Sequence, residues 1–515
     1  MRNKRFVNFA SNGTSSFLIL YLFISILIIG CGKMEKPKDN LVLLPIEDDQ
    51  TISFKLWFKV GSQNDPKGKE GIAALTADLI AEGSTQTNSY ETILDKLYPI
   101  AAGYDAKVDK EMTVISGRTH KDNLNEYYTL LTDAILKPAF KQEDFDRIKS
   151  NYLNYIEKQL RYASDEELGK AALYGSIFEG TTYNHLTVGS VESIKSITID
   201  DIKKFYKQYY TNKNLLIGIS GGFEKTLPEK MEKDLSSLPD TIPQQIDKPK
   251  TAPISGYNFL LIEKPCDATA ISFGFPINVM RGQDDFFALT LFNSWFGEHR
   301  NSSSHLYQVI RELRGMNYGD YSYIETFLHG GYYNVPDPNN ARRQQIFEVW
   351  LRPVKNENRH FVLRAALREL KNVVDNGMKK EELELTKKFL NKYALNFATT
   401  NIKRLGYAID SKFYGIDSQG DYIELFRRKI NEVTLEQVNA AIKKHIQYKN
   451  IKFAVVTRDA EQYKKDLIAN TPSPIIYATP KSDAVMAEDK LIESFPLDIK
   501  PDNIKIVQVE EMFQK

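Results

Sequence analysis

Residues 51–83 read TISFKLWFKV GSQNDPKGKE GIAALTADLI AEG, and their pattern indicates how the first half of the chain folds. Apolar side chains alternate with mostly polar neighbours at Ile52, Phe54, Leu56, Phe58 and Val60. This period of two predicts a strand with one buried face. After a polar loop, the spacing of Ile72, Leu75 and Leu79 predicts an amphipathic helix from about residue 70 to 82. The stretch is therefore a strand, a loop and a helix of an α/β unit.

Similar patterns continue to residue 220 and start again after residue 257. In the first half we expect a helix near 91–98, short strands around 104–108 and 112–116, long helices from 121 to about 160, a helix over 199–209 and a strand over 215–220. In the second half we expect strands near 259 and 271–275, a helix over 284–296 and long helices over about 361–397. Four prolines punctuate residues 237–256, which we interpret as an interdomain linker.

Two internal matches indicate that the second half repeats the first. Thr-x-x-Asp-Ile at 198–202 with Lys-Asn at 213–214 matches Thr-x-x-Gln-Val at 434–438 with Lys-Asn at 449–450, and the spacing within the two copies is identical. Residues 140–144 and 378–382 also correspond, at nearly the same separation along the chain. Two matches in register predict two copies of one α/β unit, over residues 51–236 and 257–470. The tail, 471–515, has no counterpart in the first copy.

The N-terminus has the pattern of an export signal. Arg2, Lys4 and Arg5 precede an apolar stretch over residues 17–30. As a helix that stretch would span about 21 Å, which is short against roughly 30 Å of hydrocarbon. We therefore interpret residues 1–30 as a signal peptide and 31–50 as a tether.

The end of that stretch, Ile28-Ile29-Gly30-Cys31, resembles the lipobox of bacterial lipoproteins. In that family the cysteine is acylated and becomes the mature N-terminus, and two or more acyl chains give a stable anchor. The resemblance implies an exported protein, lipid-anchored to a bacterial membrane on its periplasmic or cell-surface side. The alternative is a cysteine that only happens to follow a signal anchor.

The composition argues against several classes of function. Residues 1–30 hold three of the 68 basic residues and no acidic one, so removing them leaves 65 basic against 67 acidic residues. A near-neutral chain without a basic block gives no indication of nucleic-acid binding. Only two cysteines are present, and Cys266 has no partner once Cys31 is modified. An intrachain disulfide and a thiolate zinc site are therefore excluded.

Residues 60–78 resemble the pitrilysin/insulinase (inverted zincin) metallopeptidases. In that family such a strand and loop lead into Gly-x-Ala-His-x-x-Glu-His on a helix. The two histidines share one helix face and bind zinc, and the glutamate activates the zinc-bound water. A second glutamate, on a long helix further along the chain, is the third ligand. The resemblance implies two homologous domains, each a mainly antiparallel sheet backed by helices, facing each other across a cavity.

The four chemical positions of that motif are all occupied by other residues. Ala74 and Asp78 stand where the histidines belong, Ala77 replaces the glutamate base, and Tyr155 stands at the third ligand. A methyl group cannot coordinate zinc, and a single carboxylate with a phenol does not make a stable zinc site. We therefore expect no zinc, no other cofactor and no catalysis by this chain alone, whereas the fold is unaffected.

The resemblance extends through both halves, over about residues 51–470. Residues 178–214 follow the family's pattern before its closing strand, and residues 303–318 are similar to its second-domain signature. In heterodimeric members, the subunit without zinc contributes an arginine–tyrosine pair to peptide binding, which implies that role for Arg311 and Tyr318. Without the resemblance they would be a helix-end cation and a core-edge tyrosine. His299 and His305 flank a polar turn, and we interpret them as structural or surface residues.

These observations predict a non-catalytic, peptide-binding subunit of a lipid-anchored, pitrilysin-type zinc metallopeptidase complex outside the cytoplasm. Its partner would be a catalytic subunit with an intact zinc motif, and its substrate a peptide or unfolded polypeptide. One alternative is a stand-alone scaffold or peptide-capture lipoprotein. A weaker alternative is a metalloendopeptidase with an atypical site. A sibling gene encoding His-x-x-Glu-His would favour the first.

Overall fold

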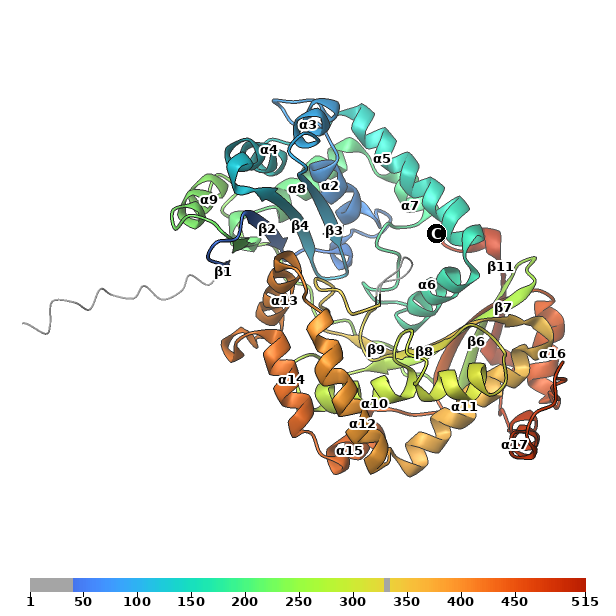
Figure 1. Cartoon of the computed structure of the whole chain (residues 1–515). Helices are drawn as coiled ribbons and strands as arrows, with labels where there is room; N and C mark the ends of the chain where they lie inside the picture. Colours follow the sequence, from blue (N-terminus) through green and yellow to red (C-terminus); the bar gives the residue numbers. More distant parts are fainter. Residues whose placement is uncertain (1–39, 328–333) are drawn as a thin grey trace, which may run out of the picture. The chain divides into compact units, whose positions relative to one another are not determined.

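A computed structural model describes residues 40–327 and 334–515 (Figure 1). The expected signal peptide and Cys31 lie outside the described residues. Within them, the chain forms two sheets, each backed by helices, in agreement with the predicted fold class. None of the helices that the structure describes has the length and apolar character needed to cross a bilayer.

The first sheet has the strand order β1-β5-β2-β4-β3. Its strands are β1 (Leu41–Pro45), β2 (Thr51–Phe58), β3 (Gly103–Val108), β4 (Thr113–His120) and β5 (Leu215–Gly221). The helices of this half are α2 (Ile72–Ala81), α3 (Tyr90–Leu97), α4 (Leu124–Leu136), α5 (Gln142–Asn154), α6 (Asp165–Ile177), α7 (Val191–Ser196), α8 (Ile199–Tyr209) and α9 (Leu227–Leu235). Between α5 and α6, the wider π-helical winding runs over Tyr155–Ala163.

The second sheet has the order β11-β6-β10-β7-β9-β8. Its strands are β6 (Tyr257–Glu263), β7 (Ala268–Ile277), β8 (Asp320–Tyr323), β9 (Gln345–Lys355), β10 (Ile451–Thr457) and β11 (Ile504–Gln508). Its helices are α10 (Asp284–Gly297), α11 (Arg359–Asn376), α12 (Lys380–Tyr393), α13 (Asn401–Tyr414), α14 (Tyr422–Glu432), α15 (Leu435–His445), α16 (Ala460–Ala469) and α17 (Asp483–Glu493). Without β11, this order repeats that of the first sheet. The tail supplies β11, which pairs in parallel with β6.

Two pairs of equivalent elements confirm the predicted duplication. Helices α8 and α15 are both eleven residues long, and strands β5 and β10 are both seven. The separation along the chain is the same for the two helices as for the two strands. The side chains of Thr198 and Thr434 cap α8 and α15 with the same capping-box geometry. The repeated threonine in the sequence is therefore a repeated helix start.

Each half places one helix on the sheet of the other half. Helix α6 packs against β7 and β10, and α13 packs against β2 and β5 (Figure 1). The starts of the two helices are separated by the same length of chain as those of α8 and α15, so they are counterparts in the duplication. Leu168 on α6 is buried with Val456 of the second sheet, and Leu405 on α13 is buried with Trp57 of the first. This reciprocal packing joins the two halves.

The packing of α13 corrects the expectation that β2 has one buried face. Ser53, Lys55 and Trp57, on the face expected to meet solvent, are 1 %, 8 % and 3 % exposed. The cause is that α13, from the other half of the chain, covers this face. The ammonium of Lys55 is accommodated there because it donates a hydrogen bond of 2.8 Å to Oδ1 of Asn339.

Candidate functional site

Helix α2 carries three of the four positions where a zinc peptidase has its chemical groups. The helix is started by Asp65, whose carboxylate accepts hydrogen bonds from the backbone N–H groups of Gly71 and Ala73 at 2.6 and 3.0 Å. Ala74 and Ala77 are 4 % and 0 % exposed, so both methyl groups are packed. Neither can bind a metal or accept a proton, which leaves Asp78 as the one polar side chain among the three.

Asp78 is held by a tyrosine rather than by a metal-binding partner. The hydroxyl of Tyr152 on α5 donates a hydrogen bond of 2.5 Å to Oδ2 of Asp78. Burial raises the pKa of Asp78 to about 7, although the hydrogen bond from Tyr152 acts in the opposite direction. Tyr155, which residue counting places at the third-ligand position, lies beyond the end of α5 and is 38 % exposed.

This set of side chains does not fit zinc. Zinc takes three or four nitrogen, sulfur or carboxylate ligands from a protein, whereas this set offers one carboxylate, one phenol and two methyl groups. Elsewhere in residues 40–327 and 334–515, no group of three or more His, Cys, Asp or Glu side chains is placed to hold a metal ion.

A cavity of about 590 Å³ lies between the two halves, and Tyr152 is one of the residues that line it. The first half contributes the end of β3 and the following turn, the end of α5 with the π-helical stretch, the inner face of α6 and the loop 184–188. The second half contributes Thr326, Phe327, Asn340, Arg342 and Glu348. Tyr152, Tyr155, Tyr174 and Phe327 give the wall an aromatic character, as in a typical ligand pocket.

A buried ion pair fixes one wall of this cavity. The guanidinium of Arg342 donates two hydrogen bonds to Asp109, at 2.6 and 2.5 Å, across the junction between the halves. Burial alone would raise the pKa of Asp109, but the charge and hydrogen bonds of Arg342 hold it below its ordinary value. The adjacent Arg343 pairs with Glu111 at 2.5 Å.

The cations of the wall are each bound to protein groups. Burial lowers the pKa of Lys110 to about 7, and its ammonium donates a hydrogen bond to the carbonyl of His185. Lys107 donates to Oδ2 of Asp337 at 2.9 Å. With Arg342 held by Asp109, these side chains shape the cavity without presenting an unpaired positive charge.

Arg311 and Tyr318 lie apart from this cavity. The Arg311 guanidinium donates a hydrogen bond of 2.6 Å to its neighbour Glu312 and stacks over the ring of Tyr307. Tyr318 is 77 % exposed. Neither lines the wall near Tyr152, so the structure does not bring them together with α2 in this chain.

The two histidines near the polar turn occupy separate surroundings. Nδ1 of His299 lies 2.5 Å from the hydroxyl of Tyr323 within an aromatic cluster. Nε2 of His305 lies 2.7 Å from Oε2 of Glu369, and its ring stacks on Trp295.

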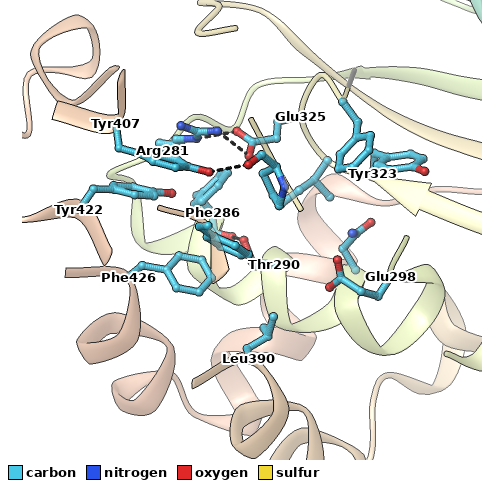
Figure 2. A pocket seen from close by; sticks show the side chains of 15 residues that line it. Arg281, Phe286, Thr290, Glu298, Tyr323, Glu325, Leu390, Tyr407, Tyr422 and Phe426 are labelled. Atoms are coloured by element: carbon cyan, nitrogen blue, oxygen red, sulfur yellow. Dashed lines mark hydrogen bonds and ion pairs between the residues drawn. The ribbon is translucent and has the colours of Figure 1, made fainter. Parts of the chain in front are cut away.

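The second copy has a small cavity at the place that corresponds to α2 and α5 of the first. There α10 follows β7 as α2 follows β2, and α12 is the counterpart of α5. Figure 2 shows the side chains around this cavity of about 60 Å³, with Arg281 paired to Glu325 at 2.9 and 3.0 Å. Arg281 also donates to Asp410 at 3.1 Å. This copy therefore has an ion-paired core at the equivalent place.

The sequence alone did not identify Tyr152, Arg342 or Glu348. An available signal was complementary charge: Asp109-Lys-Glu111 lies between two short strands, and Arg342-Arg343 precedes a later strand. These two segments are far apart in the sequence, and their pairing can be predicted only if the two halves are known to contact each other at this place.

The duplicated fold defines a class, that of metallopeptidase-like chains, and α2 of this chain holds Ala74, Ala77 and Asp78. Two family models match: "Insulinase (Peptidase family M16)" over residues 41–187, and "Peptidase M16 inactive domain" over residues 196–390. The chain belongs to the peptidase M16 family.

Relatives of this chain include proteins named as peptidases and as non-peptidases. An uncharacterized zinc protease of Rickettsia bellii (strain RML369-C) is 25% identical over 310 residues, which are 59% of this chain and 72% of that protein. The non-peptidase homolog YmxG of Helicobacter pylori (strain ATCC 700392 / 26695) is 21% identical over 412 residues, 78% and 88% of the two chains. Mitochondrial-processing peptidase subunit alpha-1 of Dictyostelium discoideum is 22% identical over 187 residues, 36% and 28% of the two.

Solved structures show the same fold. A peptidase M16 inactive domain from Pseudomonas fluorescens superposes with a TM-score of 0.70 at 24% identity. The match covers 81% of this chain and 95% of that one.

Proposed function

We propose that this chain is a non-catalytic, peptide-binding subunit of an M16-type zinc metallopeptidase complex. One observation carries the proposal: the zinc-site positions hold Ala74, Ala77 and an Asp78 bound by Tyr152, while a cavity large enough for a peptide segment opens beside them. In this proposal the chain can bind a peptide but has no groups that could cleave it. A subunit that holds substrate for a catalytic partner would have these two properties.

The geometry of β3 supports a peptide as the ligand. In the part of the chain that the structure describes, it is the last strand of its sheet, so one of its edges has no neighbouring strand there. Lys107 and Val108 at its end line the cavity. An extended peptide can pair with such an edge through its backbone while side chains enter the adjacent pocket.

A separate catalytic subunit is the second part of the proposal. The relatives include mitochondrial-processing peptidase subunits named alpha and beta, so the family has members that are named as subunits. The partner here would carry the intact His-x-x-Glu-His motif and the zinc. This chain would bind the substrate peptide and hold it in position next to the zinc of the partner. A substrate that is held in the reactive geometry is cleaved faster.

The third part is location. A lipid on Cys31 would hold the complex at a bacterial membrane outside the cytoplasm, as expected from the sequence resemblance to lipoproteins. The tether of residues 31–50 would then separate the folded part from the lipid surface.

The test uses the mature chain, a fluorescent unfolded peptide and a purified M16 subunit with an intact motif from the same genome. We expect the chain alone to bind the peptide, to contain no stoichiometric zinc by metal analysis, and to cleave nothing. Adding it to the zinc subunit should raise the rate of cleavage at least several-fold. About one tightly bound zinc per chain, or cleavage by the chain alone, would contradict the proposal. Peptide binding without stimulation would favour the stand-alone peptide-capture protein.

A further inference from the structure

Glu348 is a buried carboxylate that faces the cavity without a cation of its own. It lies on β9, is 3 % exposed, and lines the cavity wall. No lysine, arginine or histidine in the part of the chain that the structure describes forms an ion pair with it. Burial raises the pKa of Glu348 to about 7, against the opposing effect of a hydrogen bond with Trp350. Burying a charged carboxylate lowers the stability of the folded chain unless a cation or hydrogen-bond donors interact with it.

The nearby cations are already paired with other groups. Lys170 on α6 bonds Glu166 at 2.8 Å and Glu167 at 2.9 Å, and its ammonium lies over the ring of Trp350. Arg342 is held by Asp109 through both prongs of its guanidinium. Both reduce the negative potential at Glu348, but neither contacts it.

The fold is arranged so that Glu348 can occupy this place. Its register partner on β7 is Gly274, where a Cβ atom would lie 3.0 Å from Cα and 3.2 Å from Cβ of Glu348. On the other side it is paired with Tyr323 on β8. Ile346 and Trp350, two residues before and after it on β9, share its face and are buried. The carboxylate is therefore held on a rigid strand between two neighbours.

The rest of the cavity suits the stem of a basic side chain. The rings of Phe327 and Tyr174 line the same cavity as Glu348, and Tyr174 is on α6. Aromatic faces pack against the methylene groups of lysine and arginine and attract their charged ends. An aromatic wall with one carboxylate that has no ion-pair partner, beside cations that are already bound to protein groups, is complementary to such a side chain.

We propose that this cavity selects peptides with a lysine or arginine residue, and that Glu348 is the specificity-determining residue that binds its charged end. The inference rests on the proposed function, in that peptides bind in this cavity. It goes further by naming the class of side chain that is recognised and the group that recognises it.

The test measures fluorescence anisotropy with four labelled decapeptides that differ only at one central residue: lysine, acetyl-lysine, norleucine or glutamate. The wild-type chain should bind the lysine peptide about tenfold more tightly than the norleucine and acetyl-lysine peptides, and the glutamate peptide least tightly. Glu348→Gln should abolish this preference and leave the affinity for the norleucine peptide unchanged. Glu348→Asp, which keeps the charge, should retain part of it.

Controls separate this inference from the proposed function. Glu143→Gln, whose side chain is 74 % exposed on α5, should keep the full preference. Glu348→Gln removes a buried charge that has no ion-pair partner. The melting temperature of this variant should therefore not fall below that of the wild type. Equal binding of all four peptides by the wild-type chain would overturn the inference and leave peptide binding intact. A preference that persists in Glu348→Gln would also overturn it, and absence of binding to every peptide would overturn both proposals.

Discussion

Tyr152 on α5 and Asp78 on α2 are joined by a hydrogen bond at the place where the resemblance to zinc peptidases expects a metal. The two helices that would hold zinc between them are instead linked directly by their side chains. The link needs no ion, and Tyr152 also lines the neighbouring cavity. At this junction the contact between α2 and α5 is therefore made by protein groups.

The raised pKa of Asp78 predicts a pH-dependent change in stability. Because the folded chain holds the Asp78 proton more tightly than the unfolded chain, its contribution to stability is complete below about pH 4 and is lost as the pH rises to about 7. Asp78→Asn removes this loss and keeps an oxygen for the Tyr152 hydroxyl. Relative to wild type, the variant should gain on the order of 1–2 kcal/mol at pH 8 and little at pH 4.5.

Urea unfolding at the two pH values measures this difference. Glu179→Gln, which alters a carboxylate that is 82 % exposed, serves as the control and should show the same small effect at both. An equal effect of Asp78→Asn at pH 4.5 and pH 8 would mean that this carboxyl titrates normally.

The ion pair between Asp109 and Arg342 predicts a large cost for removing either partner alone. Asp109→Ala leaves a guanidinium buried without its charge partner, and we expect a loss of about 3–5 kcal/mol in the free energy of unfolding. The double variant Asp109→Ala/Arg342→Ala should cost less than the sum of the single variants, because no charge remains unpaired. Chemical denaturation of all four proteins gives the coupling energy.

An exposed pair provides the comparison. The carboxylate of Asp200 lies 3.9 Å from the ammonium of Lys203, and the two side chains are 78 % and 52 % exposed. Asp200→Ala should change the free energy of unfolding by less than about 1 kcal/mol. Additive losses for the Asp109 and Arg342 variants would show that the pair does not couple the two halves.

Local signals allowed much of the fold to be predicted from the sequence. Thr198 and Thr434 mark equivalent helix starts because a capping threonine acts only on the first turn that follows it. The burial of Lys55 could not be predicted, because α13 covers it from a distant part of the sequence. Alternation of polar and apolar residues predicts a strand. It does not indicate which element packs against the second face of that strand.

The candidate site was predicted in part for a similar reason. Ala74, Ala77 and Asp78 are placed by one helix, so their spacing alone defines their positions. A count of residues leads to Tyr155, whereas Tyr152 makes the contact with Asp78. Helix α5 ends at Asn154 and π-helical winding starts at the next residue, which changes the direction of the following side chains. The position of Glu348 in the cavity results from the packing of the two halves against each other, so no local pattern in the sequence indicates it.

The lipid anchor predicts that Cys31 decides membrane attachment. Cys31→Ala should prevent acylation, so the chain should be released from membranes or remain unprocessed. Membrane fractionation, together with labelling by an alkyne-tagged fatty acid, tests both effects. Cys266→Ala is the matched control, since it removes the only other cysteine, and it should keep the label and the membrane attachment. A Cys31→Ala chain that is processed and stays on the membrane would exclude the anchor.

The placement of Arg311 and Tyr318 predicts that they act only in a complex. In this chain they lie outside the cavity wall that holds Tyr152, and Tyr318 is largely exposed. A guanidinium and a phenol at the surface can bind peptide carbonyls or a carboxylate once a partner encloses them. The variant Arg311→Ala/Tyr318→Phe should therefore bind peptide in isolation as wild type does. Mixed with the zinc subunit, it should support cleavage at a rate reduced several-fold to about tenfold.

Three measurements on this double variant distinguish the possible roles of the pair. Its free energy of unfolding should stay within about 0.5 kcal/mol of wild type, because neither side chain is part of a core. Lys490→Ala, with a side chain that is 69 % exposed on α17, controls for the loss of a surface charge and should leave cleavage unchanged. Undiminished cleavage by the double variant would assign both residues to ordinary surface. A marked loss of stability would make them structural, and reduced binding by the isolated chain would place the peptide against them instead of in the cavity.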